Sequence, residues 1–385
     1  MSHSLLSFGT INKNIKYPIL LGVTHSFIRI SLALMRGKDA ANCALIQNCI
    51  MYLGEFLIIF LFIIETKRSN SKFRQITDLS VNKILKIIGL IFLCCLIDFV
   101  GSIALTIVET KDGTEFLELI YKLFTMGLTA VLSRYLLHYH YYIHHIIGYG
   151  ILFFGLSFYS VLEVIGNFKV SDDILVIIAL FIIYLLSSFI DIIEKYLMET
   201  EYVSPYLIIS TEGAFGLILC FISFQFLNDT CTKTFFICSD EIHYWENFKA
   251  FFNDTNLIIA LILFFIGVFC VNTFKMLTNQ SYSPTHRAIG DNLSAFIFWI
   301  IQFFAFKSKE ELWKTILKGI TYIIMFLGIF IFLELIIINV FDMNRNTKDS
   351  INTRVDEEEK EIEYINDNDI NLLNQQELHN KEETE

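Results

Sequence analysis

The sequence of 385 residues contains only 3 prolines, and only 18% of its residues are charged. A water-soluble chain of this length carries about a quarter charged residues. Many of the charges lie in the acidic stretch 342–385, which largely accounts for the net charge of −11. Hydrophobic residues make up 54% of the chain and include 38 phenylalanines. This composition excludes a water-soluble globular protein.

Several motifs of catalytic chemistry are also missing. The eight cysteines lack the spacing of a zinc site, and those in apolar runs are expected to act as small hydrophobic side chains. The chain has no Tyr-Asp…Gly-x-Gly-Asp pair, no His-Glu-x-x-His and no Gly-x-Ser-x-Gly. We therefore expect neither an enzyme nor a bound cofactor.

Long apolar runs recur at about the 20-residue length that crosses a bilayer. We predict an all-α polytopic membrane protein with ten spanning helices, at residues 16–34, 43–64, 84–108, 115–137, 144–165, 174–197, 205–227, 256–276, 287–306 and 313–341. Residues 1–15 form a short N-terminal segment. The tail 342–385 is acidic, Asn-rich and poor in apolar residues, which predicts disorder.

The orientation in the membrane depends mainly on one basic connecting segment. Residues 65–83 contain Lys67, Arg68, Lys72, Arg74 and Lys83, which indicate the cytosolic side. An even number of crossings then places both termini in the cytosol. The loop 228–255 faces the lumen or the exterior.

That loop contains features of an oxidising compartment. Asn228 and Asn253 begin two glycosylation acceptor triplets, and Cys231 and Cys238 lie between them. A disulfide between the two cysteines is stable only in such a compartment. The alternative is a pair of unlinked thiols beside unused triplets.

Ten crossings divide into two groups of five, 16–165 and 174–341. An odd number of crossings per half gives the halves opposite orientations, which is the inverted repeat of many secondary transporters. The second helix reads MYLGEFLIIF with Glu55, and its counterpart reads ISTEGAFGLI with Glu212. Each glutamate therefore has a glycine beside it in a corresponding helix.

Four ionisable residues have apolar sequence for two helical turns or more on at least one side: Glu55, Asp98, Lys122 and Glu212. Because burying a charge in a bilayer is costly, such residues are candidates for function. They either line a water-filled path for a solute or protons, or form buried ion pairs, such as Lys122 with Asp98, that fix helix packing.

Other ionisable residues lie near the predicted helix ends. We expect Arg134, Glu194, Lys195 and Lys275 to extend toward the membrane interface. Glu334 lies one to two turns from the cytosolic end of the last helix. It either extends to the interface in the same way or has a functional position inside the membrane.

The stretch SPTHRAIGDNLSAF, residues 283–296, is the other concentration of polar residues. Pro284 suits the first turn of a helix, and Arg287 and Asp291 then share one face, followed by Asn292. This helix start either offers unpaired N–H groups to an anion or forms a surface ion pair at the cytosolic mouth.

The segment HYHYYIHH, residues 138–145, contains four histidines. By composition it resembles a metal-binding tract. Tyrosine and histidine are also common at membrane boundaries, and a pH-sensitive cytosolic rim is a further alternative. We expect no metal site here.

The motifs together resemble the drug/metabolite transporter superfamily, within it the F-type branch of the solute carrier 35 group, and distantly the chloroquine-resistance-transporter-like proteins. The resemblance spans residues 15–340 and rests on QNCIMYLGEFL, LIDFVGSIAL, IDIIEKYL, SPYLIISTEGAFGLIL and SPTHRAIGDNLSAFIFW. Ser294 or Ala295 stands where that branch has a basic residue, and Asp191 and Glu194 do not coincide with its paired acids.

The resemblance implies two inverted halves, a central cavity and alternating access in an internal membrane. We expect a secondary-active transporter of a small polar or charged solute, nucleotide-sugar-, metabolite- or drug-like, with protons as a potential coupling ion and no nucleic-acid partner. The expected solute or proton pathway comprises Glu55, Asp98, Lys122, Glu212, Asp291 and Asn292. The alternative is a non-transporting scaffold or receptor whose acidic tail recruits a cytosolic partner. The Golgi, lysosome or vacuole is favoured over the plasma membrane.

Overall fold

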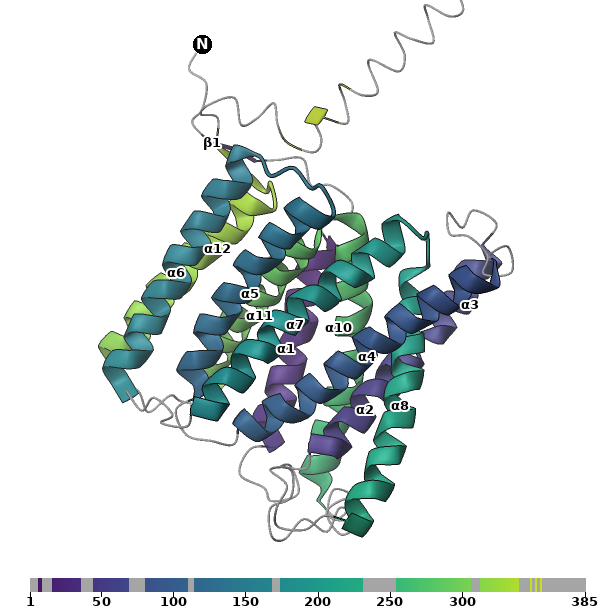
Figure 1. Ribbon diagram of the computed structural model, residues 1–385. Helices are drawn as coiled ribbons and strands as arrows, with labels where there is room; N and C mark the ends of the chain where they lie inside the picture. The colour runs from purple at the N-terminus through teal and green to yellow at the C-terminus, as the bar shows by residue number, and fades with distance from the viewer. Residues whose placement is uncertain are drawn as a thin grey trace, which may run out of the picture.

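Helices form most of the computed structural model, which describes residues 6–8, 16–35, 44–68, 80–109, 114–167, 174–230, 254–305, 312–338, 347, 350–351 and 354. Figure 1 shows the helices side by side in one bundle. The elements are β1 (Leu6–Phe8), α1 (Lys16–Met35), α2 (Ala44–Phe56), α3 (Ile59–Lys67), α4 (Val81–Glu109), α5 (Thr114–Leu136), α6 (Ile143–Asn167), α7 (Ile174–Glu199), α8 (Pro205–Thr230), α10 (Thr255–Ser281), α11 (Pro284–Ala305), α12 (Leu312–Phe332) and β2 (Ile336–Ile338).

Local sequence signals explain where several helices begin. Pro205 and Pro284 occupy the first positions of α8 and α11, where the fixed φ of proline suits a helix. The side chain of Asp254 accepts a hydrogen bond of 2.9 Å from the N–H of Asn256 and caps α10. The predicted helix start at Pro284 is confirmed.

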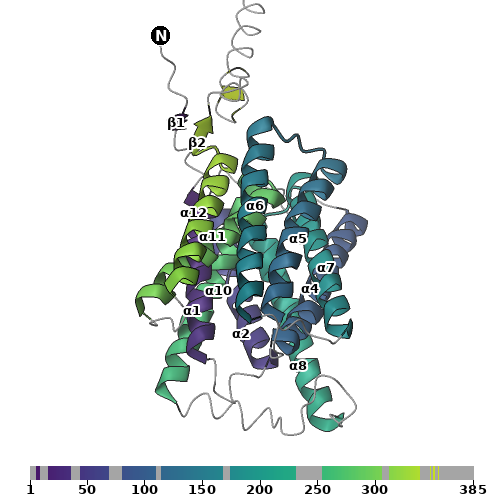
Figure 2. The ribbon, with the colours of Figure 1, turned by 90° about the vertical axis from the view of Figure 1, so that its left-hand side faces the viewer.

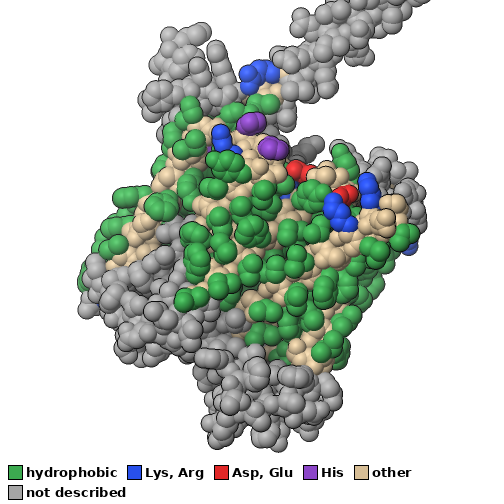
Figure 3. Space-filling model, in the orientation of Figure 1, with side chains coloured by type: hydrophobic (Ala, Val, Ile, Leu, Met, Phe, Trp, Pro, Cys, Tyr) green, Lys and Arg blue, Asp and Glu red, His purple; other side chains and the backbone are tan. Residues whose placement is uncertain are grey.

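Within the described residues, six helical stretches are long and apolar enough to cross a membrane: Leu45–Lys67, Val81–Ile103, Ile143–Leu162, Pro205–Phe224, Thr255–Ser281 and Trp313–Phe332. Large hydrophobic side chains are exposed along them, and Figure 3 shows such side chains covering most of the described part of one face. The charged and histidine side chains seen there lie toward its upper edge. These are the features of an all-α membrane protein.

The predicted helix 43–64 is interrupted after Glu55. The N–H of Ile58 bonds to the carbonyl of Glu55 at 3.0 Å, three residues back instead of four, and a turn at Leu57–Ile58 separates α2 from α3. A tightened turn inside a helix often marks a hinge. The apolar run of Leu45–Lys67 continues across this point, so hydropathy alone does not reveal the break.

The last helix ends at Phe332, and the predicted end at residue 341 is wrong. Glu334 takes a left-handed conformation with φ of 60°, and the N–H of Leu335 bonds to the carbonyl of Phe330 at 2.9 Å. This is the Schellman arrangement that closes a helix, usually with glycine at the left-handed position. Glu334 therefore lies in a turn beyond α12.

The residues after that turn form β2, which pairs antiparallel with β1 so that Leu6 faces Ile338 and Phe8 faces Ile336. Figure 2 shows this small sheet beside the end of α12. The segment before the first helix and the segment after the last one therefore meet at the same end of the bundle.

The helices pack in a few dominant pairs: α6 with α12, α1 with α10 and α11, α2 with α8, and α7 with α4 and α5. Two glycines bring α6 and α12 close together. A Cβ at Gly148 would lie 2.6 Å from the nitrogen of Phe332, and a Cβ at Gly328 would lie 2.7 Å from the nitrogen of Leu152. Both distances are too short for any larger residue without a shift of backbone.

Candidate functional site: a buried acidic cluster

Helices α2 and α8 cross so closely that a glycine is needed between them. A Cβ at Gly213 would lie 2.3 Å from the nitrogen of Phe56 and 2.8 Å from the Cβ of Glu55. The residue before this glycine is Glu212. The crossing therefore brings the predicted intramembrane glutamates of the two helices into one neighbourhood.

Two of the predicted acids meet neutral hydrogen-bond donors. The side-chain amide of Asn272 on α10 donates to Glu55 Oε1 at 2.8 Å, and only 5% of the surface of Glu55 is exposed. The hydroxyl of Tyr52 on α2 donates to Asp98 Oδ2 on α4 at 3.0 Å. These donors solvate the carboxyl groups without adding a positive charge.

Glu212 lies among charged groups, and one of its carboxyl oxygens has no partner among the described residues. Its exposed fraction is 7%, and its Oε1 has no hydrogen-bond partner within the described part of the chain. The charged groups that act on its carboxyl are Glu194, Glu55, Asp98 and Arg287. Because an unsatisfied buried carboxyl oxygen is costly, its presence in a folded protein calls for an explanation such as a bound ligand or water.

A buried ion-pair triad lies beside these acids. Arg287 on α11 contacts Asp191 at 2.9 Å and also pairs with Glu194, both on α7. Glu194 is only 1% exposed, so the prediction that it extends to the membrane interface is wrong. Asp191 and Glu194 are spaced i, i+3, so the sequence indicates that they share one helix face but not that this face points inward.

Lys195 is also buried, at 1% exposure, and its predicted extension to the interface is wrong as well. Its ammonium group donates to the main-chain carbonyls of Asn279, Gln280 and Tyr282, and it pairs with Glu199 at 3.1 Å. The last carbonyls of a helix have no intrahelical partner and carry a partial negative charge. Lys195 therefore anchors the end of α10 to α7.

The amide of the predicted pathway residue Asn292 donates to the carbonyl of Ala288 at 2.8 Å and contacts Met126 Sδ on α5 at 3.1 Å. These contacts hold its side chain between α11 and α5.

Two further pathway residues, Lys122 on α5 and Asp291 on α11, lie on described helices, but their side chains are outside the described ones. The pairing of Lys122 with Asp98 stays a prediction. The predicted disulfide and glycosylation positions also lie outside the described residues or side chains: Asn228, Cys231, Cys238 and Asn253.

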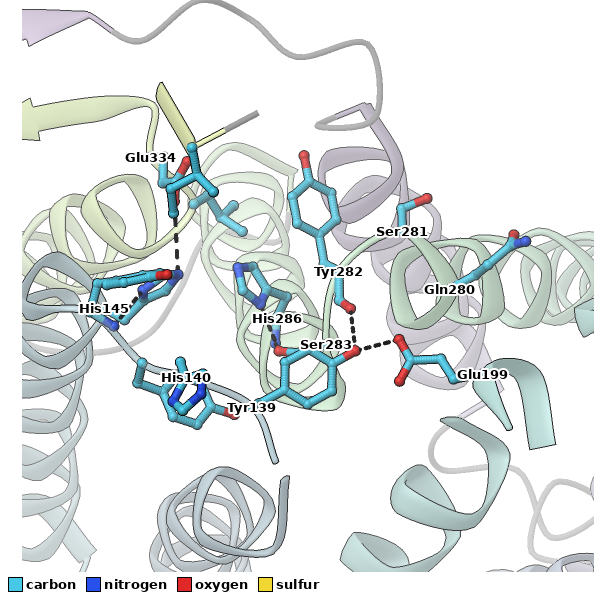
Figure 4. A pocket seen from close by; sticks show the side chains of 14 residues that line it. Tyr139, His140, His145, Glu199, Gln280, Ser281, Tyr282, Ser283, His286 and Glu334 are labelled. Atoms are coloured by element: carbon cyan, nitrogen blue, oxygen red, sulfur yellow. Dashed lines mark hydrogen bonds and ion pairs between the residues drawn. The ribbon is translucent and has the colours of Figure 1, made fainter. Parts of the chain in front are cut away.

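A separate cavity of about 330 Å³ opens near the end of the bundle where β1 and β2 meet, lined mainly by tyrosines, histidines and two glutamates (Figure 4). The hydroxyl of Tyr139 lies 2.6 Å from Glu199 Oε1 and 3.2 Å from the carbonyl oxygen of Tyr282, and the shorter distance favours Glu199 as the acceptor of its single hydrogen. Burial and the adjacent Glu199 carboxylate raise the pKa of Tyr139, so it remains a donor at neutral pH.

Part of the histidine-rich segment borders this cavity. His144 Nε2 lies 2.9 Å from Glu334 Oε1 and His145 Nε2 lies 3.9 Å from it, so three potential metal ligands stand within 4.8 Å of one another. However, the N–H of Tyr142 donates to His145 Nδ1 at 3.3 Å, which places the hydrogen of the neutral ring on Nε2. That nitrogen would have to lose its hydrogen to coordinate a metal. The geometry therefore favours a hydrogen-bonded cluster that links α6 to the turn after α12.

Comparison with known proteins gives little guidance. No protein-family model and no curated protein matches this chain. A solved structure described as "Crystal structure of protein" matches with a TM-score of 0.48 at 12% identity, over 83% of this chain and 95% of that one. A likeness at that level carries no functional argument.

Proposed function

We propose that this chain is a secondary-active transporter that moves a small polar or charged solute across a membrane by alternating access. Glu55, Asp98 and Glu212 form its solute or proton site. The observation that carries this proposal is the buried carboxyl of Glu212, whose Oε1 has no partner within the described residues. A scaffold has no need of such a group, whereas a carrier exposes it to solute during its cycle.

The packing of the helices supports two related halves, α1–α6 and α7–α12, with α2 and α3 counted as one crossing. In chain order, the counterparts are α1 and α7, α2 and α8, α4 and α10, α5 and α11, and α6 and α12. When each helix is exchanged with its counterpart, the pair α1–α10 becomes α7–α4 and the pair α1–α11 becomes α7–α5. The same exchange turns α2–α10 into α8–α4 and leaves the pairs α2–α8 and α6–α12 unchanged. All of these pairs are in contact, as expected for two halves related by a two-fold axis.

The site lies where these halves meet. Glu55 belongs to the first half and Glu212 to the second, and the close crossing at Gly213 joins their helices. The interruption of the helix at Leu57–Ile58, two residues after Glu55, provides a point at which α2 can bend relative to α3. Rocking of one half against the other would change the surroundings of both glutamates.

The membrane orientation belongs to the same proposal. The basic segment 65–83 favours a cytosolic position, which places both termini in the cytosol and the loop 228–255 in the lumen of an internal membrane such as the Golgi, lysosome or vacuole. A deglycosylation shift that disappears in the Asn228→Gln and Asn253→Gln double variant supports this. Protection of an N-terminal tag from a cytosolic protease contradicts it.

Uptake by purified protein in proteoliposomes tests the function. Labelled nucleotide sugars, nucleotides, amino acids, peptides and organic cations are compared at two pH gradients. The control is Glu201→Gln, because Glu201 lies in the loop between α7 and α8 and pairs with Lys86. We expect uptake that Glu212→Gln abolishes and Glu201→Gln retains.

Folded protein that takes up none of these compounds contradicts the proposal. Truncation after Asn344 separates the alternatives further. A transporter keeps its uptake without the acidic tail, whereas a scaffold that recruits a partner through the tail loses its function.

A further inference from the structure

Most of the described ionisable side chains around Glu212 are acidic. Five carboxyl groups from four helices face one guanidinium group among the described side chains of this acidic cluster. The acids are Glu55 on α2, Asp98 on α4, Asp191 and Glu194 on α7, and Glu212 on α8; the guanidinium is that of Arg287 on α11. Because uncompensated charge in a low-dielectric interior is costly, these carboxyl groups must either take up protons or be balanced by a cation.

The described buried cations beside these acids, Arg287 and Lys195, already have partners. Arg287 contacts both Asp191 and Glu194, and Lys195 is directed to main-chain carbonyls at the end of α10. Among the described side chains, which do not include that of Lys122, a phosphate or sulfate entering this region would find a cationic donor only by displacing a carboxylate from Arg287.

The three carboxyl groups that Arg287 does not contact, Glu55, Asp98 and Glu212, are defined here as the carboxylate triad. Asn272 and Tyr52 each give the triad one hydrogen bond. Ionised carboxylates offer about four acceptor sites each, so most of this capacity is unused. The unpartnered Oε1 of Glu212, in a side chain more than nine-tenths buried, is the clearest vacant acceptor.

We propose that the solute bound by the carboxylate triad is an organic cation, an amine, quaternary ammonium or guanidinium compound, and that phosphorylated anions are excluded. This rests on the proposed transport function and narrows its solute class. An ammonium group has three donors and a guanidinium five, and neither has an acceptor, which complements a site that consists of acceptors. The positive charge also offsets part of the negative charge of the triad.

Thermal unfolding of the purified full-length protein tests the charge class without requiring transport. The probes are choline and its uncharged isostere 3,3-dimethylbutan-1-ol, together with tetraethylammonium, agmatine, spermidine and, as anions, uridine diphosphate and uridine diphosphate glucose. Ionic strength and pH are held constant. We expect at least one cation to raise the unfolding midpoint by about 2 °C or more when present well above its Kd, while the uncharged isostere and the anions leave it unchanged.

Two variants connect the effect to the triad. Glu212→Gln and Asp98→Asn should each weaken the apparent affinity for the stabilising cation by about tenfold or more, whereas Glu201→Gln should leave it unchanged. Two variants are used so that the failure of one to fold does not end the test. Stabilisation that survives both substitutions overturns the assignment to the triad.

Other outcomes overturn the inference itself. These are stabilisation by the uridine phosphates, equal stabilisation by choline and its uncharged isostere, or no stabilisation by any cation, the last of which is expected if the triad binds only protons. Glu212-dependent uptake of an anion would overturn the cation inference and leave the transport proposal standing. Binding of a cation without uptake of any solute would contradict transport and retain the cation site.

Discussion

Replacement of Arg287 by methionine is expected to destabilise the protein severely. The substitution keeps an unbranched side chain of similar length but leaves Asp191 and Glu194 buried without their counter-charge. Arg287 is 5% exposed and Glu194 is 1% exposed, so water cannot readily replace the guanidinium. The perturbation therefore leaves uncompensated charge in the interior.

The contact distance sets the magnitude. At an effective dielectric constant of about 20, unit charges 2.9 Å apart, the separation of Arg287 and Asp191, attract by roughly 6 kcal/mol. The desolvation of both groups offsets part of that attraction. Breaking a buried pair by removal of one partner typically costs about 3–5 kcal/mol, and we expect Arg287→Met to fall in that range.

The control removes the charges of Arg287, Asp191 and Glu194 together. The triple variant, which adds Asp191→Asn and Glu194→Gln to Arg287→Met, also removes the two carboxylates that Arg287 contacts. We expect it to recover most of the lost stability, because replacement of a complete buried ion pair is often neutral. Unfolding of purified protein in detergent, by heat and by denaturant, measures both variants. A loss of less than about 1 kcal/mol in Arg287→Met, or a triple variant no more stable than the single one, would refute this reasoning.

Two further substitutions test the packing and the site. Gly148→Ala forces a Cβ against the backbone of Phe332 and should lower the free energy of unfolding by about 1–3 kcal/mol more than the control Gly150→Ala. Gly150 lies two residues away on α6, and a Cβ there meets no atom within 4 Å. Equal unfolding midpoints for the two variants would contradict the close crossing of α6 and α12. Tyr52→Phe removes the hydroxyl that donates to Asp98 and should lower stability by about 1–2 kcal/mol in denaturant unfolding; an unchanged value would mean that the hydrogen bond contributes nothing.

The positions of the helices could be predicted from the sequence because apolar runs of bilayer length are a local property. Each of the ten predicted ranges contains a helix, and Pro284 is the first residue of α11, where the fixed φ of proline suits a helix. The interruption at Leu57–Ile58 and the stop before Glu334 were not predicted. Both occur in predominantly hydrophobic sequence, and no glycine or proline stands at the residues whose backbone changes, Leu57, Ile58 and Glu334.

The candidate site was accessible to sequence reasoning only in part. Glu55 and Glu212 could be selected because each stands alone in apolar sequence, where an uncompensated acid is costly. The pairing of Arg287 with Glu194 could not be predicted from the sequence, because the two residues are 93 positions apart and meet only through the packing of α11 on α7. A partner chosen by tertiary contact leaves no pattern in the local sequence of either helix.

The most direct test of the account is trans-stimulation of uptake. Proteoliposomes are preloaded with the unlabelled form of the compound that accumulates in the panel assay, and entry of the labelled form is measured. Alternating access predicts faster initial uptake into preloaded vesicles than into empty ones, because a loaded carrier returns to the outside without waiting for an empty one to reorient. Initial uptake that is equal or slower in preloaded vesicles would contradict a carrier built from two halves around Glu212.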